Sequence, residues 1–325
     1  MKEIYVIDIL PDEEITDFFM IKKSEIRTGS NNKEYLDIVL ADKTGEIGGK
    51  KWDVAGPEAD TLYRLKAGDI VKVRATVNEW NGSLQLKVQR IRAATDADKL
   101  EKADFIKAAP EKPEDMYDYI LGVAKGLSDE DFKAVALKLL EDNKQRLLYW
   151  PAAKSNHHAI YAGLLYHVKR MLMMADSASK VYTNLNRDLL LTGVIIHDIE
   201  KLNEMDSDQN GIVSEYTFEG NLLGHLVAGV KTIDHLKDEI GLSNEKAVML
   251  EHMMISHHYE PDFGSPKKPL FPEAEALHYM DMLDSKMYDM EDALRTVKGG
   301  EFSDRIWSLD NRRLYKSTFT HSGTD

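Results

Sequence analysis

The sequence predicts two structural units of different class: a small β-barrel at the N-terminal end, followed by an all-α unit. Residues 1–95 contain segments in which apolar and polar residues alternate, which is the pattern of half-buried strands. From residue 113 to about 295, apolar residues instead recur at helical spacing. Residues 96–112 follow neither pattern and are rich in alanine, aspartate and lysine, which is typical of a linker. We therefore expect domains at 1–95 and 113–325.

Strands of the first unit are expected at residues 34–42, 69–80 and 83–91, and a turn at residues 80–83 joins the last two into a hairpin. A short helix is expected at residues 57–66. About five strands with one helical insert fit a small barrel of the OB type. A small β-sandwich is the alternative interpretation.

The second unit opens with two amphipathic segments, at residues 113–127 and 128–143. Ser128 is expected to cap the second helix, because Glu130 and Asp131 follow in its first turn, where acidic residues complement the helix dipole. Helices are expected to continue to the end of the periodic pattern.

Composition excludes several classes of protein. The 325 residues include no cysteine, which excludes disulfides and thiolate metal sites. Acidic residues interrupt the N-terminal segment, and no apolar run is long enough to span a membrane, so a cytoplasmic protein without a membrane partner is expected. The net charge of −14 argues against a nucleic-acid partner, but residues 1–95 carry 15 basic and 16 acidic residues and are nearly neutral.

Histidines are concentrated in the helical part and recur near carboxylates, as in the segment IIHDIEK (195–201). Imidazole nitrogen and carboxylate oxygen are ligands that Mn²⁺, Fe²⁺, Zn²⁺ and Mg²⁺ accept. A chain without cysteine has no other strong transition-metal site to offer. A single histidine in a helix is more often structural, but the combination of His167, the pair His197 and Asp198, and Asp281 predicts a metal site.

This order of residues, H…HD…D, resembles the metal-dependent phosphohydrolases of the HD superfamily, and HDIEK (197–201) is similar to their HD-x-x-K form. Within that superfamily the chain resembles the YhaM-type 3′→5′ exoribonucleases, which place an OB-fold nucleic-acid-binding domain before an all-α HD domain. The matching segments are FFMIKKSEIRT (18–28), DKTGEIGGKKWD (42–53), PAAKSNHHAIYAGLLYH (151–167), GNLLGH (220–225) and SHHYEPDFGSPKKPLFPEAEALHYMDMLDSKM (256–287).

The resemblance implies a centre of two divalent cations, with Mn²⁺ as the first candidate and Fe²⁺, Co²⁺, Zn²⁺ or Mg²⁺ as alternatives. The implied ligands are His167, His197, Asp198, His225, His257 and Asp281. Asp198 would bridge the two cations, because its carboxylate has two oxygens. Lys201 would hold a phosphate oxygen as a point charge.

Residues beside the ligands leave two choices open. Asp281 and Asp284 lie three apart on one helix, and the family pattern favours Asp281 as the ligand. His257 is likewise chosen over His258. His158, His258 and Asp284 are then expected to orient the ligands or to contact substrate.

Nucleic acid is expected to bind to the barrel by stacking of bases on aromatic rings within a basic groove. The residues expected to take part are Phe19, Lys22, Lys50, Trp52 and Trp80, with Tyr35 as a further candidate. Single-stranded RNA or DNA is the expected partner, and homo-oligomers are compatible with the sequence.

The expected function is metal-dependent 3′→5′ hydrolysis of single-stranded RNA to nucleoside monophosphates. One alternative is an HD phosphohydrolase that acts on free nucleotides or cyclic dinucleotides, with the barrel as a regulatory module. A second alternative is a non-enzymatic RNA-binding adaptor with a degenerate metal centre.

Overall fold

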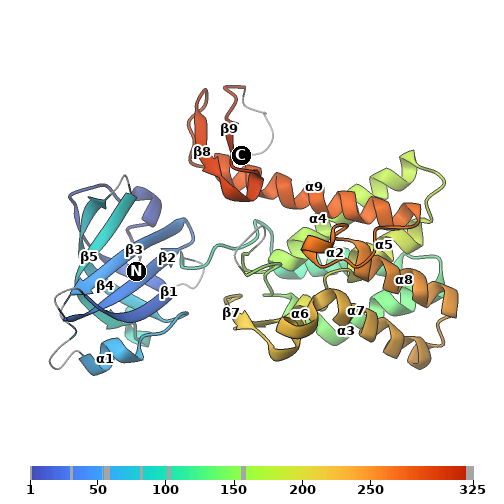
Figure 1. Cartoon of the computed structure of the whole chain (residues 1–325), viewed down its shortest axis with the longest axis horizontal. Helices are drawn as coiled ribbons and strands as arrows, with labels where there is room; N and C mark the ends of the chain where they lie inside the picture. The colour runs from blue at the N-terminus through green and yellow to red at the C-terminus, as the bar shows by residue number, and fades with distance from the viewer. Residues whose placement is uncertain are drawn as a thin grey trace. The chain divides into compact units, whose positions relative to one another are not determined.

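The computed structural model describes residues 2–29, 32–52, 54, 59–80, 83–100, 104–154 and 159–319. The chain divides into two compact units, residues 1–108 and 109–325, and Figure 1 shows a β-barrel in the first and a helical bundle in the second. Each unit has its own hydrophobic core. In the described part of the chain, no helix combines the length and the apolar character that a membrane span requires.

The strands of the first unit close into a barrel in the order β1-β2-β3-β5-β4, which confirms the expected OB-type fold. Its elements are β1 (Glu14–Thr28), β2 (Glu34–Asp42), β3 (Gly45–Trp52), α1 (Ala59–Arg64), β4 (Ile70–Trp80) and β5 (Ser83–Ala93). Closure is made by β3 and β5, which run parallel where residues 48–50 pair with residues 85–87. A β-carbon on Gly49 would lie 3.2 Å from Ile38 and 3.4 Å from Leu86, so the closing contact leaves little room for a side chain.

A buried ion pair fixes the N-terminal segment to the barrel. Lys2 Nζ lies 3.1 Å from Asp42 Oδ2 and donates to the carbonyl oxygen of Phe18 at 2.8 Å. The Lys2 ammonium also lies 4.0 Å from the ring centre of Phe19, which is fully buried. The prediction that Phe19 contacts nucleic acid is therefore wrong. The run of apolar residues in β1 does not show which ring faces outward, and Phe19 belongs to the barrel core.

The expected linker, residues 96–112, contributes to both units. It begins with a short 3₁₀ turn, η3 (Asp96–Asp98), in which Asp98 pairs with Arg92 of β5 at 2.7 Å. Phe105 is buried, and the first unit extends to residue 108. The N–H of Ala109 then bonds to the carbonyl of Tyr161, inside the second unit.

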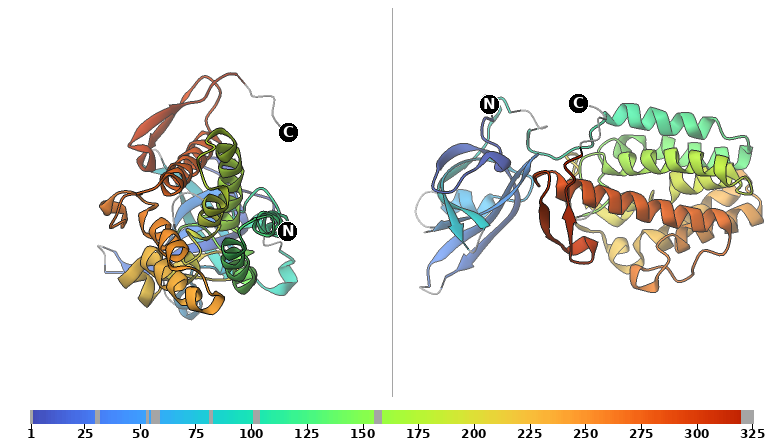
Figure 2. Two further views of the ribbon diagram at one scale, coloured as in Figure 1. Left: turned by 90° about the vertical axis from the view of Figure 1, so that its right-hand side faces the viewer. Right: turned by 90° about the horizontal axis from the view of Figure 1, so that it is seen from above.

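The second unit is a helical bundle arranged around α5. Its helices are α2 (Pro113–Lys125), α3 (Glu130–Leu147), α4 (Gly163–Val181), α5 (Arg187–Ile196), α6 (Lys201–Glu204), α7 (Phe218–Ile240), α8 (Asn244–Ser256) and α9 (Pro272–Leu294). Every residue from 189 to 196 is buried, because α2, α3, α4, α8 and α9 all pack against α5. Figure 2 shows α4 and α9 running alongside each other.

Local details of this unit differ from expectation. The N-cap of α3 is Asp129, whose carboxylate accepts the N–H groups of Asp131 at 3.1 Å and Phe132 at 3.2 Å. The expected cap, Ser128, lies one residue too early, since serine and aspartate cap helices about equally well. Two short hairpins also interrupt the helical pattern: β6 (Met205–Ser207) with β7 (Val213–Tyr216), and β8 (Phe302–Ile306) with β9 (Arg312–Tyr315).

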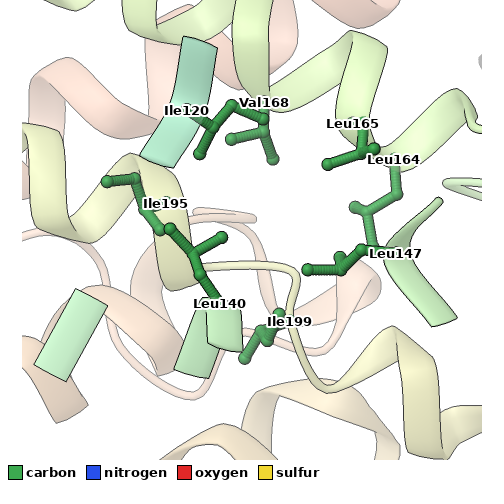
Figure 3. A pocket seen from close by; sticks show the side chains of 8 residues that line it. All are labelled: Ile120, Leu140, Leu147, Leu164, Leu165, Val168, Ile195 and Ile199. Atoms are coloured by element: carbon green, nitrogen blue, oxygen red, sulfur yellow. The ribbon is translucent and has the colours of Figure 1, made fainter. Parts of the chain in front are cut away.

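A cavity of about 10 Å³ lies between α2, α3, α4 and α5, and Figure 3 shows the side chains around it. Its lining is entirely aliphatic: Ile120, Leu140, Leu147, Leu164, Leu165, Val168, Ile195 and Ile199. A lining without polar groups offers nothing to a cation, a phosphate or an ordered water. This cavity is therefore a packing defect of the core and no candidate for the active site.

Candidate metal centre

The segment VIIHDIEK occupies the end of α5 and the turn that follows it. His197 is the C-cap of α5, and its N–H donates to the carbonyl of Gly193 at 2.9 Å. Gly193 allows α8 to approach, because a β-carbon there would lie 2.1 Å from Met253 Cε. Asp198 follows in the turn, and both side chains are buried. Because α5 lies at the centre of the unit, His197 and Asp198 are placed in its interior.

His167, His197 and Asp281 form the first cluster, from α4, the end of α5 and α9. Their ligand atoms lie within 4.8 Å of one another. His167 Nε2 lies 3.3 Å from His197 Nε2 and 3.4 Å from Asp281 Oδ1. Two ligand atoms that each lie about 2.1 Å from one cation are separated by roughly 3.0–3.4 Å, so this spacing fits a shared cation.

Asp198, His225, His257 and His258 form the second cluster, again within 4.8 Å. Asp198 Oδ1 lies 3.4 Å from His225 Nε2 and 3.8 Å from His257 Nε2. These three atoms are buried and have no hydrogen-bond partner among the described residues. Buried polar atoms without a partner are rare in folded proteins and call for an explanation. A divalent cation at their centre would satisfy all three, so the residues present fit a metal.

Asp198 is common to both clusters. Its Oδ1 faces the second cluster, whereas its Oδ2 lies 3.3 Å from His197 Nε2 and 3.9 Å from His167 Nε2. The Lys201 ammonium lies 2.7 Å from the same Oδ2. One carboxylate therefore has an oxygen directed at each cluster and a cationic side chain beside it.

The five histidines of the two clusters share a mode of support. In each one, Nδ1 faces an acceptor: Asp284 Oδ2 for His167 (2.8 Å), Val194 O for His197 (2.9 Å), Glu204 Oε1 for His225 (3.0 Å), Met254 O for His257 (2.8 Å) and Phe263 O for His258 (2.8 Å). An acceptor at Nδ1 holds the proton there, so the Nε2 lone pair is directed at the cluster.

Charge in the centre is distributed in a way that suits cation binding. Burial lowers the pKa of His257 well below its usual value, which keeps this imidazole neutral, as a ligand must be. Burial also disfavours a charged His167, but hydrogen bonds to Asp281 and Asp284 outweigh it and raise the pKa of His167 to about 9. For Lys201, the neighbouring Asp198 carboxylate overcomes burial and raises the pKa. The carboxylates around His167 and Lys201 thus favour positive charge, and a cation bound by His167 would displace the proton from its Nε2.

The two ambiguous pairs have different positions. Asp281 faces His167 Nε2, whereas Asp284 holds the opposite nitrogen of that ring and lies 2.6 Å from Arg170 Nε. Asp284 is thus placed to orient His167. His257 and His258, in contrast, both contribute atoms to the second cluster. His158 lies outside the described residues.

Residues expected to bind nucleic acid are only partly brought together on the barrel. Trp52 is 48% exposed and its ring centre lies 4.7 Å from that of Tyr35, with the Lys50 ammonium 5.7 Å from the Tyr35 ring. Lys22 lies apart from this group beside Glu46, at 3.9 Å. The backbone of Trp80 ends β4, and its side chain is outside the described part.

Glu204 is a residue of the centre that the sequence did not single out. Its Oε1 accepts from both the backbone N–H and Nδ1 of His225, at 3.1 Å and 3.0 Å. It lies three residues past HDIEK in a segment with several other carboxylates, and nothing in that spacing distinguishes it from a surface glutamate.

Comparisons with known proteins agree with this division of the chain. The OB-fold nucleic acid binding domain family matches residues 21–94, and the HD domain family matches residues 164–286. The 3′-5′ exoribonuclease YhaM of Geobacillus sp. (strain WCH70) is 40% identical over 308 residues, which are 95% of this chain and 93% of that protein. This chain belongs to the YhaM family. The resemblance noted from the H…HD…D order is thereby confirmed.

Two solved structures are similar to part of this chain. The second OB-fold domain of replication protein A from Methanococcus maripaludis is 21% identical, with 29% of this chain and 94% of that chain covered and a TM-score of 0.23. The mitochondrial single-stranded DNA binding protein Rim1 from S. cerevisiae is 20% identical, with 26% and 96% covered and a TM-score of 0.23.

Proposed function

We propose that this chain is a metal-dependent hydrolase that removes nucleoside monophosphates from the 3′ end of single-stranded RNA, with single-stranded DNA as a second substrate class. The observation that carries the proposal is the position of Asp198, whose two oxygens face two separate histidine clusters. The family relative that is 40% identical over 95% of this chain is named a 3′-5′ exoribonuclease, which supports the choice of substrate and direction.

The centre would hold two divalent cations, one in each cluster, with Asp198 shared between them. Imidazole and carboxylate donors without thiolate suit Mn²⁺, Fe²⁺, Co²⁺ and Zn²⁺, and a set this rich in histidine suits Mg²⁺ less. We take Mn²⁺ as the first candidate. When bound, a pair of cations lowers the pKa of a coordinated water and neutralises the charge that develops on a phosphate.

Lys201 adds a cationic group that is independent of metal. Its side chain is 12% exposed and its ammonium contacts Asp198. A phosphate brought to the bridging carboxylate would come within reach of this ammonium, which donates to a phosphate oxygen as a compact point charge. The buried surroundings strengthen such a contact relative to water.

The barrel would hold the single strand through Trp52, Tyr35 and Lys50. Aromatic rings stack on bases of any identity, and a lysine beside them neutralises the backbone. Because residues 1–95 are nearly neutral while the whole chain carries −14, the strand is expected to be held by the barrel rather than attracted by the helical unit.

The proposal is tested by incubating the full chain and Mn²⁺ with an RNA labelled at its 5′ end. The expected products are a ladder that shortens from the 3′ end and free nucleoside monophosphates. A circular RNA of the same sequence is the matched control, because it has no 3′ end. Cleavage of the circle would contradict the exonuclease assignment. Turnover of nucleotides or cyclic dinucleotides with no loss of RNA would favour the alternative phosphohydrolase.

A further inference from the structure

We propose that Glu204 is a positioning residue for the second cluster: it holds His225 with Nε2 directed at Asp198 and so sets the affinity of that cluster alone for its cation. The inference rests on the proposed two-cation function. In this role Glu204 neither contacts substrate nor binds metal.

Glu204 makes two hydrogen bonds with His225. One carboxylate oxygen accepts both the backbone N–H, at 3.1 Å, and Nδ1–H, at 3.0 Å. A carboxylate only accepts, so the imidazole proton must lie on Nδ1. Nε2 then carries a lone pair; this atom is buried, has no hydrogen-bond partner among the residues that the structure describes, and lies 3.4 Å from Asp198 Oδ1. Glu204 thus fixes both the position and the tautomer of this ligand.

Helix α7 is kinked immediately before His225. Gly224 has φ +67° and ψ 168°, a conformation that is essentially restricted to glycine. In an uninterrupted helix the N–H of His225 would donate to the carbonyl of Asn221. The kink turns this N–H toward Glu204 instead. The energetic cost of breaking α7 is explained if the redirected backbone and ring are both required at the carboxylate.

Glu204 is also in close contact with the start of α7. The carbonyl oxygen of Glu204 accepts the N–H of Thr217 at 2.9 Å, and a β-carbon on Gly220 would lie 2.1 Å from that oxygen. The segment GNLLGH therefore has two glycines for one purpose: Gly220 lets α7 approach Glu204, and Gly224 bends α7 so that His225 meets its side chain.

The effect should be specific to one cluster. Within the second cluster, His225 is held by a carboxylate, whereas His257 and His258 donate to backbone carbonyls that no substitution can remove. The first cluster has its own carboxylate support, Asp284 behind His167. Glu204 and Asp284 are therefore matched positions, and each serves as the control for the other.

The experiment is a calorimetric titration of the metal-free full chain with Mn²⁺, without RNA, for the wild type, Glu204→Ala, Glu204→Gln and Asp284→Asn. Loss of a carboxylate that supports a ligand histidine weakens metal binding by about 10–100-fold. Glu204→Ala should show this loss for one of two cations and leave the other unchanged. Glu204→Gln retains an oxygen acceptor for Nδ1–H and should recover part of the affinity. Asp284→Asn should weaken the other cation.

Electron paramagnetic resonance supplies a second readout. Two neighbouring Mn²⁺ ions couple magnetically, so at a Mn²⁺ concentration that just saturates both wild-type sites, Glu204→Ala should show the spectrum of a single ion where the wild type shows a coupled pair. Wild-type affinity for both cations in Glu204→Ala would overturn the inference. Equal weakening of both would also overturn it, because that is the result of a general structural role.

Failure of the proposed function is distinguishable from failure of this inference. If the wild type binds two Mn²⁺ ions but leaves RNA intact, the exoribonuclease assignment fails while the role of Glu204 stands. If the wild type binds fewer than two, the two-cation centre fails and the inference fails with it.

Discussion

Replacing Lys201 by methionine should destabilise the metal-free protein much more than the Mn²⁺-loaded protein. The Lys201 ammonium lies 2.7 Å from Asp198 Oδ2, and the two side chains are 12% and 2% exposed. Methionine keeps most of the side-chain volume and removes the charge. The Asp198 carboxylate then loses its nearest cationic partner in a buried environment.

The magnitude follows from the burial of the pair. Removal of one partner from a buried ion pair costs about 3–5 kcal/mol. The low end applies here, because His167, with its pKa raised to about 9, places a second positive group 3.9 Å from the same oxygen. A loss of about 3 kcal/mol lowers the unfolding temperature of a unit of this size by roughly 6–12 °C. Bound cations neutralise Asp198, so most of this loss should disappear with Mn²⁺.

Calorimetric unfolding in chelator and in Mn²⁺ measures both values. The matched control is Lys246→Met, which removes a more exposed ammonium from Asp129 and Asp131, at 2.7 Å from each. Loss of this more exposed contact with two carboxylates should cost about 1 kcal/mol, with or without Mn²⁺. Single-turnover hydrolysis of RNA by Lys201→Met should fall about 10²–10³-fold, with the metal content intact. An equal loss of stability in chelator and in Mn²⁺ would refute the reasoning.

Further outcomes are expected at three other positions. Asp198→Ala should lower the content of both cations, measured by elemental analysis, and abolish RNA hydrolysis; retention of two tightly bound ions would contradict the shared carboxylate. Trp52→Ala should weaken binding of a single-stranded RNA to the metal-free protein by about 5–150-fold in fluorescence anisotropy, the value of one stacked base, and should leave hydrolysis of a small phosphodiester unchanged. Burial lowers the pKa of His252, whose Nε2 accepts the N–H of Leu270 at 3.0 Å. Because its folded pKa lies below its unfolded value of about 6.5, the unfolded state binds the proton more tightly, so stability is complete above pH 6.5 and falls as the pH drops through the folded pKa. His252→Gln should flatten this decline in chemical denaturation curves between about pH 7 and 5, and an unchanged pH profile would show that His252 does not contribute.

Much of the fold is readable from the sequence because its signals are local. Alternation located β2 at Glu34–Asp42, and helical spacing located α2 from Pro113. The features that the sequence did not reveal depend on contacts between residues that are far apart in the sequence. The burial of Phe19 depends on the N-terminal segment, whose Lys2 lies over its ring. The strands of the hairpins β6–β7 and β8–β9 are too short to show a periodic pattern.

The candidate site divides in the same way. His167, His197, Asp198 and Asp281 could be chosen because their order along the chain resembles a known family. Glu204 could not be, because its importance arises from the kink at a glycine twenty residues later and from a contact made only in three dimensions.

The Nδ1 contacts also bear on what a preparation of this protein would contain. All five ring orientations are held by hydrogen bonds within the protein, so the ligands are oriented independently of a cation, unlike those of a zinc finger, where binding energy and folding energy are the same. A ready-made site of nitrogen and oxygen donors is filled according to metal supply and the general order of divalent affinities. The ion found in protein isolated from cells would therefore depend on the metals in the growth medium. The ion required for activity has to be established by removing the bound metal and adding back one kind of ion at a time.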